Sequence, residues 1–230
     1  MDLSELVSHT RNNVLRDTAL PSLWSDAELT LYLNQAVKEF AIRTHEIVDD
    51  STAAVTTFDT VAGQAVYDLH ESIIIVNEAG LVEYNDSDEE ISYTPLRDRT
   101  RGQLRRRFSS GRPCYYTAQV RTDSIRLDPT PDAVYTIEMI VARKPLANMA
   151  NPTDEPEISE EYHLNLCDYA AYRALVSNQP EGANMAAADT FKGIWDLGVR
   201  DAKRAIALKR AGETPQARAN WTGKRYRSHA

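Results

Sequence analysis

Residues 23–47 read LWSDAELTLYLNQAVKEFAIRTHEI and predict one well-defined helix. Ser25 can cap the backbone N–H of Glu28 while the Glu28 side chain reaches back, which is the pairing of a capping box, and Trp24 can pack on Leu29 as a hydrophobic staple. Apolar residues then recur at helical spacing, at Leu29, Tyr32, Leu33, Ala36, Val37, Phe40 and Ala41. This spacing predicts a helix with one broad buried face.

Helical patterns recur near both ends of the chain, in residues 2–16, in a stretch that begins at Ser159 and in residues 183–211. Asp2 and Glu5 are placed as a second capping box. The short connection at 179–182 favours antiparallel neighbours. We therefore expect the N- and C-terminal helices, residues 1–50 and 159–211, to close into one antiparallel helical bundle.

The middle of the chain changes to a period of two and to β-branched residues. The expected strands are residues 55–58, 65–69, 73–76, 80–84, 91–95, 114–120, 124–127 and 134–142. Gly63 can supply a positive φ for a hairpin turn between the first two. We expect an α+β fold in which residues 51–143 form an inserted antiparallel β-rich domain, and residues 144–158 a connector rich in proline, asparagine and acidic residues.

Composition indicates a soluble globular protein, with 42% apolar and 26% charged residues among 230. A run of 18 apolar residues and a signal peptide are both missing from the sequence, so a cytosolic protein without a membrane partner is expected. Cys114 and Cys167 lie far apart and belong to no metal-binding or disulfide pattern. Both are predicted to be buried free thiols.

The net charge of −8 is unevenly distributed along the chain. Residues 200–230 hold nine basic residues against Asp201 and Glu213, a net charge of +7, so residues 1–199 carry −15. This division suggests a tail that docks on an acidic partner or on nucleic acid, with a solvated helix end as the alternative. Residues 212–230 contain Gly and Pro, few apolar residues and much charge. They are predicted to be an extended C-terminal tail that orders on binding.

Arginines are concentrated in a segment predicted as a short helix from Leu96 to Phe108. Seven of them fall between positions 97 and 112, opposed only by Asp98: Arg97, Arg99, Arg101, Arg105, Arg106, Arg107 and Arg112. Guanidinium groups bind phosphate or carboxylate oxygens bidentately. The cluster can therefore face DNA, pair with the acidic loop 85–90 of another subunit, or be a solvated basic helix.

Evidence for an active site is weak. Glu160 and His163 have the Glu-x-x-His spacing of di-iron carboxylate bundles, but those sites need the motif twice, and no other histidine has a glutamate three residues before it. A pair at the start of a helix is the favoured interpretation. The sequence contains no GxSxG motif, and neither cysteine lies in a known catalytic motif. We expect no catalytic residues, no metal and no cofactor.

The order of four segments resembles the phage head-to-tail adaptor proteins, including the tail tubular protein A type of short-tailed phages. The segments are LWSDAELTLYLNQAVKEF (23–40), TTFDTVAGQAVYDLHESIIIVNEAGLVEYN (56–85), GRPCYYTAQVRTDSIRLDPTPDAVYTIEMIVARKP (111–145) and EISEEYHLNLCDYAAYRAL (157–175). The resemblance covers roughly residues 3–210 and is one of pattern, without a short invariant motif.

This resemblance implies a structural virion protein and not an enzyme. It implies a dodecameric ring beneath the portal protein that extends the DNA channel and carries tail nozzle or tail fibre proteins, assembled in the host cytoplasm. It also implies an extended C-terminal segment that embraces the portal. The matching portal-binding candidates are Arg218, Trp221, Lys224, Arg225, Tyr226 and Arg227. The alternatives are a nucleic-acid-binding packaging or regulatory protein that uses the Arg97–Arg112 segment, and an enzyme with an unrecognised site.

Overall fold

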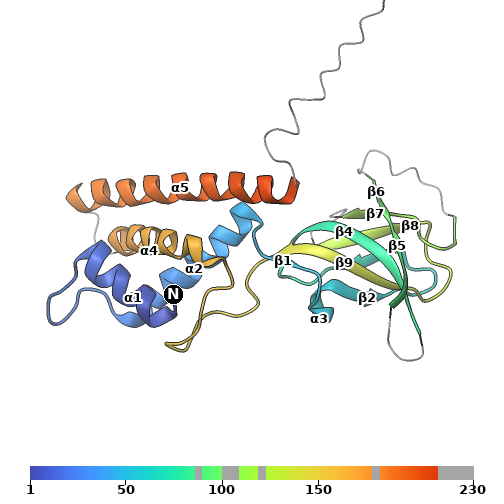
Figure 1. Ribbon diagram of the computed structural model, residues 1–230, viewed down its shortest axis with the longest axis horizontal. Coiled ribbons are helices and arrows are strands. Elements are labelled where there is room, and N and C mark those ends of the chain that lie inside the picture. The colour runs from blue at the N-terminus through green and yellow to red at the C-terminus, as the bar shows by residue number, and fades with distance from the viewer. Residues whose placement is uncertain (86–89, 100–108, 119–122, 178–181, 212–230) are drawn as a thin grey trace, which may run out of the picture. The chain divides into compact units, whose positions relative to one another are not determined.

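The computed structural model describes residues 1–85, 90–99, 109–118, 123–177 and 182–211. Helices lie toward both ends of the chain and strands between them, which confirms the predicted α+β class (Figure 1). The described residues form two compact units: the helical unit, within residues 1–36 and 149–211, and the β unit, within residues 37–148. Residues 37–50 and 144–148, assigned from sequence to the bundle and the connector, fall within the β unit.

The elements of the helical unit are α1 (Leu3–His9), the π-helical turn η1 (Thr10–Leu15), the first part of α2 (Asp26–Thr44), the 3-10 turn η3 (Glu160–Tyr162), α4 (His163–Ser177) and α5 (Gly182–Ala211). The helix predicted for residues 2–16 is thus continuous but changes from α to π geometry after His9. It ends at Arg16, which has a left-handed backbone with a φ of 55°.

Both predicted capping boxes are confirmed. At α1, the Glu5 N–H donates to Asp2 Oδ1 at 2.8 Å and the Asp2 N–H donates to Glu5 Oε2 at 3.1 Å. At α2, the Ser25 N–H donates to Glu28 Oε2 at 2.9 Å and the Glu28 N–H donates to Ser25 Oγ at 3.3 Å. Each box satisfies two backbone donors that a helix start leaves unpaired.

Helix α4 packs against α5 and against α1 with η1 (Figure 1). The rings of Tyr169 on α4 and Trp195 on α5 lie 5.1 Å apart, and Trp195 is fully buried. Two hydrogen bonds connect the end of α4 to α2 and to Trp24, two residues before α2. Trp24 Nε1 donates to the Ala174 carbonyl at 3.1 Å, and the Tyr32 hydroxyl donates to Ser177 Oγ at 2.9 Å.

Two glycines on α5 have different surroundings. A Cβ atom at Gly198 would collide with the amide group of Asn165 on α4, whereas a Cβ atom at Gly193 would meet open space. The side chain of Asn165 therefore lies directly against the α5 backbone at Gly198. A larger residue at position 198 would push α4 and α5 apart or displace the Asn165 amide.

Asp168 on α4 gives the helical unit a pH-dependent stability. Burial raises its pKa to about 6, against the opposing effect of nearby His9. A raised folded-state pKa means that the folded protein holds this proton more tightly than the unfolded chain, so stability falls as the pH rises from about 4 to about 6. We expect Asp168→Asn to raise the free energy of unfolding at pH 7 relative to wild type by about 1–2 kcal/mol. The effect is smaller than the full pKa shift would give, because the Asp168 side chain is partly exposed and solvent screens its charge.

Denaturant titrations at pH 4, 5, 6 and 7 would measure this difference through tryptophan fluorescence, because Trp24 and Trp195 lie in the helical unit. The stabilisation by Asp168→Asn should grow with pH over this range. Asp189→Asn, at an exposed position of α5, should show no such trend. A difference that is constant between pH 4 and pH 7 would contradict the assignment.

The β unit begins within α2 and contains β1 (Val48–Asp49), the short helix α3 (Ala53–Thr56), β2 (Thr57–Asp59), β3 (Val66–Asp68), β4 (Ile73–Tyr84), β5 (Glu90–Pro95), β6 (Arg97–Asp98), β7 (Tyr115–Ala118), β8 (Ser124–Asp128) and β9 (Thr136–Arg143). One sheet has the order β1-β9-β4-β5, with β2 also paired to β9, and the other has the order β3-β8-β7-β6. Among the strands that the structure describes, the pairs are antiparallel except β6 with β7, which is parallel.

Both sheets contribute to one hydrophobic core, which includes Leu81 and Ile137 from the first sheet and Tyr67, Ile125 and Leu127 from the second. The two strands predicted at 73–76 and 80–84 are a single strand, β4. One bulge in its pairing with β9, between Val76 and Glu78, lies at the polar residues between the two predicted strands, and a second lies between Ile73 and Ile75.

The predicted hairpin around Gly63 is wrong. Gly63 does have a positive φ of 84°, but β2 pairs with β9 and β3 with β8, so the two flanking strands belong to different sheets. Residues Val55 and Thr56 lie in α3, where both of their N–H groups donate to the Thr52 carbonyl. Both β2 and β3 are strands, as the alternation of residues predicts, but each pairs with a strand that is distant in sequence.

The predicted arginine-rich helix from Leu96 is also wrong where the structure describes it. Leu96 is buried in the β core and its N–H donates to the Ala79 carbonyl at 2.9 Å, and Arg97 and Asp98 form β6. Burial of Leu96 holds the chain extended at the sheet edge. Residues 100–108 lie outside the described residues. Cys167 is buried as predicted, whereas Cys114 is exposed because it precedes β7 on the surface.

Candidate interaction surfaces

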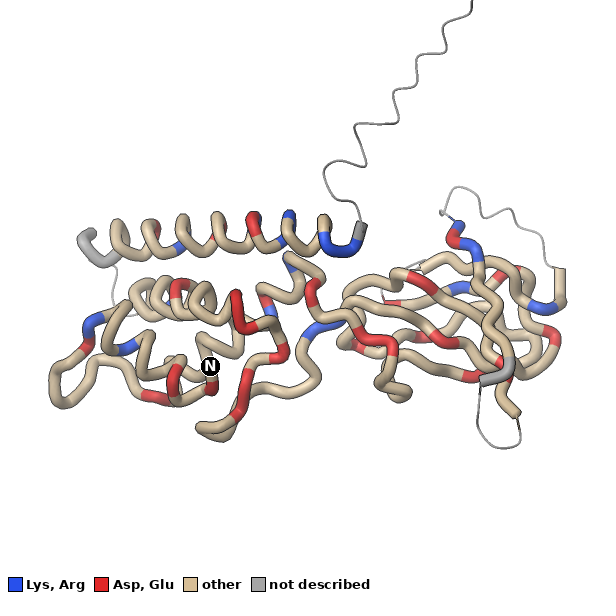
Figure 2. Tube along the Cα trace, in the orientation of Figure 1, with Lys and Arg blue, Asp and Glu red and all other residues tan. Residues whose placement is uncertain are grey.

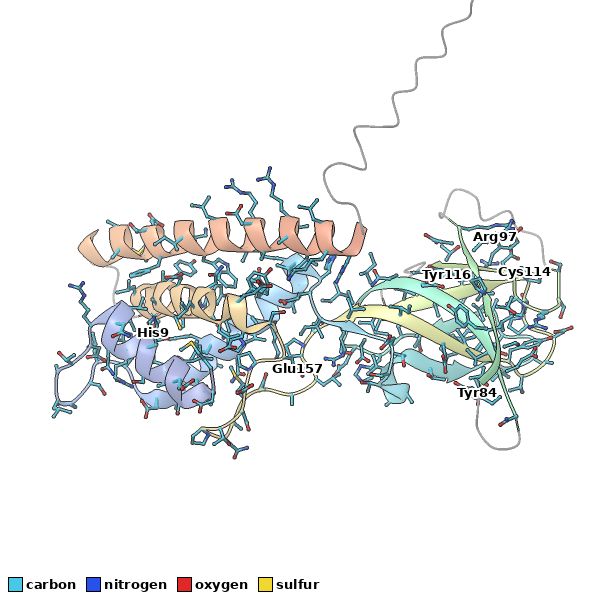
Figure 3. The ribbon with its side chains drawn as sticks, in the orientation of Figure 1. His9, Tyr84, Arg97, Cys114, Tyr116 and Glu157 are labelled. Atoms are coloured by element: carbon cyan, nitrogen blue, oxygen red, sulfur yellow. The ribbon has the colours of Figure 1, made fainter. Side chains whose placement is uncertain are left out.

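The described part of the arginine segment forms the edge of the second sheet. Strand β6 runs parallel to β7, with Arg97 opposite Tyr115 and Asp98 opposite Tyr116. The Arg97 side chain is exposed at this edge, near Cys114 and Tyr116 (Figure 3). The edge therefore presents Arg97 to solvent.

Two other arginines of the segment already have carboxylate partners. Arg99 Nη1 lies 2.8 Å from Asp128 Oδ2, and the Arg99 guanidinium carbon lies 3.3 Å from the centroid of the Tyr115 ring, a cation–π contact. Arg112 Nη2 lies 3.0 Å from Glu83 Oε1. These contacts fix the side chains within the β unit and neutralise part of the positive charge available to a phosphate backbone.

The structure thus brings Arg97, Arg99 and Arg112 to one end of the β unit. Arg101, Arg105, Arg106 and Arg107 lie outside the described residues. The same is true of the predicted portal-binding residues of the tail: Arg218, Trp221, Lys224, Arg225, Tyr226 and Arg227. Contact with DNA or with a neighbouring subunit is therefore still a hypothesis for the arginine segment.

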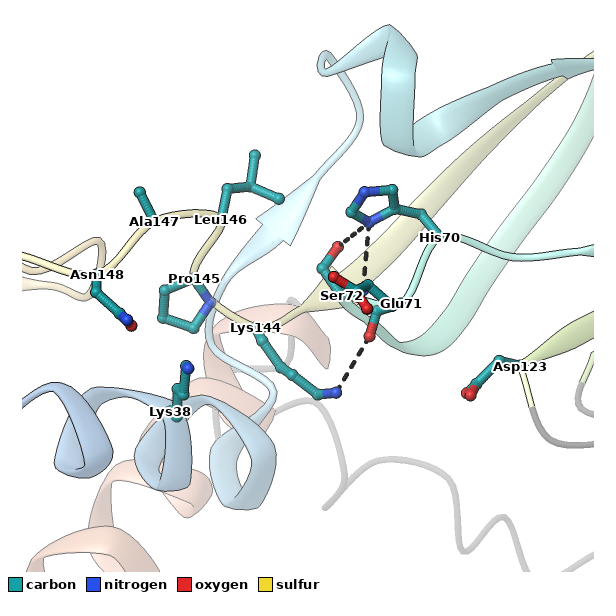
Figure 4. Close-up of a pocket in the computed structure, with 10 residues that line it drawn as sticks. All are labelled: Lys38, His70, Glu71, Ser72, Asp123, Lys144, Pro145, Leu146, Ala147 and Asn148. Carbon is teal, nitrogen blue, oxygen red and sulfur yellow. Dashed lines mark hydrogen bonds between the residues drawn. The ribbon is translucent and has the colours of Figure 1, made fainter.

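The β unit also has a polar pocket of about 450 Å³, which was not predicted from the sequence (Figure 4). It is lined by Lys38, His70, Glu71, Ser72, Asp123, Lys144, Pro145, Leu146, Ala147 and Asn148. Lys144 Nζ donates to the Glu71 carbonyl at 3.1 Å. The lining comes from α2 and from three loops, at residues 70–72, 123 and 144–148, so no local motif indicated it.

A serine and a histidine meet in this pocket, but their arrangement is that of a turn. His70 Nδ1 lies 2.8 Å from Ser72 Oγ and accepts the Ser72 N–H at 3.2 Å. Both donors come from a residue two positions away, and within the described residues no carboxylate is hydrogen-bonded to the other ring nitrogen. A catalytic triad needs that third group to orient the imidazole. The pair therefore stabilises the turn before β4.

Glu160 and His163 are likewise engaged in structural contacts. His163 is buried, its Nδ1 lies 3.1 Å from the Met1 amine and its Nε2 3.1 Å from the Ile158 carbonyl oxygen. Glu160 lies 3.6 Å from the same amine. Across the described ranges, no group of three or more His, Cys, Asp and Glu side chains is arranged as metal ligands would be. The contacts of His163 place it as a structural histidine at the start of α4.

The family model described as SU10 adaptor protein matches residues 1–219. The chain belongs to the SU10 adaptor protein family. This is a family of phage head-to-tail adaptors, which confirms the resemblance found in the sequence. No curated protein matches the chain.

Membership of the SU10 adaptor family makes this chain a structural component of the virion. An adaptor acts through surfaces that contact the portal and tail proteins. Among the described helices, none is long and apolar enough to cross a bilayer.

Proposed function

We propose that this adaptor forms a dodecameric ring between the portal and the tail nozzle or tail fibres, and that the ring extends the channel for phage DNA. The observation that carries the proposal is the family match over residues 1–219, which includes both compact units. Assembly in the host cytoplasm, before DNA ejection, belongs to the same proposal.

The helices are the part of the chain suited to repetition around a ring. We propose that the N- and C-terminal helices form an antiparallel bundle in each copy and that the β-rich region is displayed from it. Support comes from the buried contacts of α4 with α1, η1 and α5 and from the hydrogen bonds of Trp24 and Tyr32 to α4.

The charge distribution is compatible with a DNA channel. Residues 1–199 carry a net charge of −15, and Figure 2 shows Asp and Glu spread over both units. An acidic lumen repels the DNA backbone and allows sliding, whereas a basic one would hold it. The carboxylate partners of Arg99 and Arg112 further reduce the positive charge that a nucleic-acid-binding alternative would require.

Mixing the purified adaptor with the portal of the same phage tests the proposal. Electron microscopy should show a ring of added density beneath the portal, and the free adaptor should bind duplex DNA weakly. Failure to bind the portal, together with tight and salt-dependent binding of duplex DNA, would support the packaging or regulatory alternative instead.

Deletion of residues 212–230 should weaken portal attachment and leave the folded units intact, because we propose this segment as the portal-binding tail. Pull-down with immobilised portal measures attachment, and thermal unfolding measures the fold. A variant with the same 19 residues in scrambled order keeps the charge and separates electrostatic attraction from recognition by Trp221 and Tyr226. Collapse of thermal stability on deletion would refute the role of the segment as an independent tail.

A further inference from the structure

The loop between η1 and α2 is exposed and contains no charged residue at its tip. Residues 18–23, Thr-Ala-Leu-Pro-Ser-Leu, are all exposed, with the Leu20 side chain 97% accessible and Leu23 61% accessible. Figure 2 shows the tip as an uncharged stretch between charged positions. In a chain with 26% charged residues, such a tip is a candidate for contact with another protein.

Buried polar contacts hold this loop at both ends. Asp17 accepts the N–H groups of Leu23, at 2.9 and 3.0 Å, and of Trp24, at 3.2 Å. Arg11 Nη1 donates to Asp17 at 3.3 Å and to the Trp24 carbonyl at 2.7 Å, and Arg11 Nη2 lies 2.5 Å from Asp26. The side chains of Arg11 and Asp17 are only 14% and 4% exposed. The loop is thus ordered before any partner arrives, which lowers the entropic cost of binding.

Helix α5 offers a second apolar surface on its outer side. Ile194, Leu197 and Leu208 are 47%, 50% and 56% exposed, and their spacing of 3 and 11 residues places them on one face of the helix. The opposite face, with Trp195, is the one buried against α4. Figure 1 shows the loop at the left edge beside α1 and α5 along the top, so the two surfaces lie on different elements of the helical unit.

The charges beside the two surfaces are of opposite sign. Asp26, with a side chain 80% exposed, and Glu28 follow the loop at the start of α2. Arg200 and Arg204 are exposed beside Leu197 on α5, and Asp201, whose Oδ1 lies 3.9 Å from Arg200 Nε, is the one carboxylate in the sequence of residues 200–211, which therefore keeps a net positive charge. Apolar contact between the loop and α5 would therefore bring acidic residues toward basic ones, which favours this orientation.

We propose that the loop of one copy docks on the outer face of α5 of a second copy, with Leu20 against Leu197. The proposal deepens the ring assembly proposed above and rests on it. A closed ring of identical subunits requires a head-to-tail interface, in which each copy uses two different surfaces. The loop and α5 supply two such surfaces on one helical unit.

The size of the loop limits the strength of the contact. A stable interface uses about 20–30 residues on each side, and this loop has six at its tip. The contact alone should give weak, concentration-dependent association in solution. Copies held next to one another on a portal would associate far more strongly, because the effective concentration rises.

Cysteine cross-linking tests the contact directly. In a Cys114→Ser background, a tagged Leu20→Cys variant and an untagged Leu197→Cys variant are mixed, bound to purified portal and treated with a short bismaleimide. We expect tagged-to-untagged dimers in the mixture and none with either variant alone. Leu164→Cys, at a position 54% exposed on α4, is the matched control and should not cross-link to position 20.

The outcomes separate this inference from the ring proposal. Portal complexes that form without a 20-to-197 cross-link overturn the docking contact and leave the ring standing. Cross-links between two Leu20→Cys copies also overturn it, because they indicate a symmetric loop–loop contact. Cross-linking in concentrated adaptor that fails to bind portal supports the contact and contradicts the ring beneath the portal.

A charge variant provides a second readout. Leu20→Asp should weaken self-association in sedimentation experiments by roughly tenfold or more, because it places a carboxylate in an apolar contact. Leu164→Asp should leave it unchanged. Equal circular dichroism and tryptophan fluorescence of the two variants would show that folding is unaffected, and equal self-association would refute the contact.

Discussion

Asp49→Ala should lower the free energy of unfolding of the β unit by about 3–5 kcal/mol, because it removes the Asp49 carboxylate that neutralises the buried Arg143 guanidinium. Asp49 Oδ2 lies 2.5 Å from Arg143 Nε, and the two side chains are 4% and 11% exposed. Asp49 Oδ1 also accepts the N–H groups of Ser51 at 3.1 Å and Thr52 at 2.9 Å. The residue therefore joins β1, β9 and the turn before α3.

The pKa of Asp49 supports a charged carboxylate in this position. Burial alone would raise it, but hydrogen bonds from Thr52 and Arg143 outweigh burial and hold the pKa well below its usual range. A lowered folded-state pKa adds stability above about pH 4, which is lost as the pH falls through the folded value. The destabilisation by Asp49→Ala should therefore shrink in acid.

Chemical denaturation and hydrogen exchange of the β9 amides would measure the effect of Asp49→Ala. The matched control is Asp50→Ala, which removes a neighbouring but exposed carboxylate and should change stability by less than about 0.5 kcal/mol. Equal effects of the two substitutions at pH 7 would contradict a special role for the buried pair.

Arg11→Met should destabilise the helical unit by about 3 kcal/mol, since it leaves the buried Asp17 carboxylate without its cation. Methionine preserves much of the side-chain volume, so the loss reports the charge and hydrogen bonds of the guanidinium. Tryptophan fluorescence during denaturation is a suitable probe, because Trp24 lies within this cluster. Arg16→Met, at an exposed position, is the control.

The same substitution should affect assembly through the loop. Without the Arg11 contacts, residues 17–24 would no longer be held in one conformation, and binding would carry the entropic cost of ordering them. Self-association should therefore weaken even under conditions where the helical unit stays folded. Addition of Asp17→Asn to Arg11→Met should recover part of the stability, since it removes the uncompensated charge. If the double variant is no more stable than Arg11→Met, the ion pair is not the cause.

Sequence reasoning succeeded where the physical cause was local. The capping boxes at Asp2 and Ser25 depend on residues three positions apart, and both are present. It failed where distant residues decided the outcome. The strand formed by Thr57–Asp59 was predicted to pair across Gly63 but pairs with β9, about eighty residues away. Alternation in a strand identifies its buried face but not its neighbour.

The arginine segment illustrates the same limit for the candidate surfaces. Its composition favours a helix, yet burial of Leu96 and pairing with β7 keep the described part extended. The carboxylate partners of Arg99 and Arg112 come from β8 and β4, which no local pattern indicates. The ordered loop was also missed, because its ends are held by a cluster of Arg11, Asp17 and Trp24 that matches no standard local motif.

The contact of Asn165 with the α5 backbone predicts how the two glycines of that helix should vary during evolution. Glycine is less favourable than alanine in a helix by about 1 kcal/mol, so selection without other constraints would replace it. Gly193, which faces open space, should drift toward alanine and other helix formers among relatives. Gly198 should be retained unless position 165 changes with it. Among relatives, residues 165 and 198 should therefore vary together, whereas residue 193 should vary independently of residue 165.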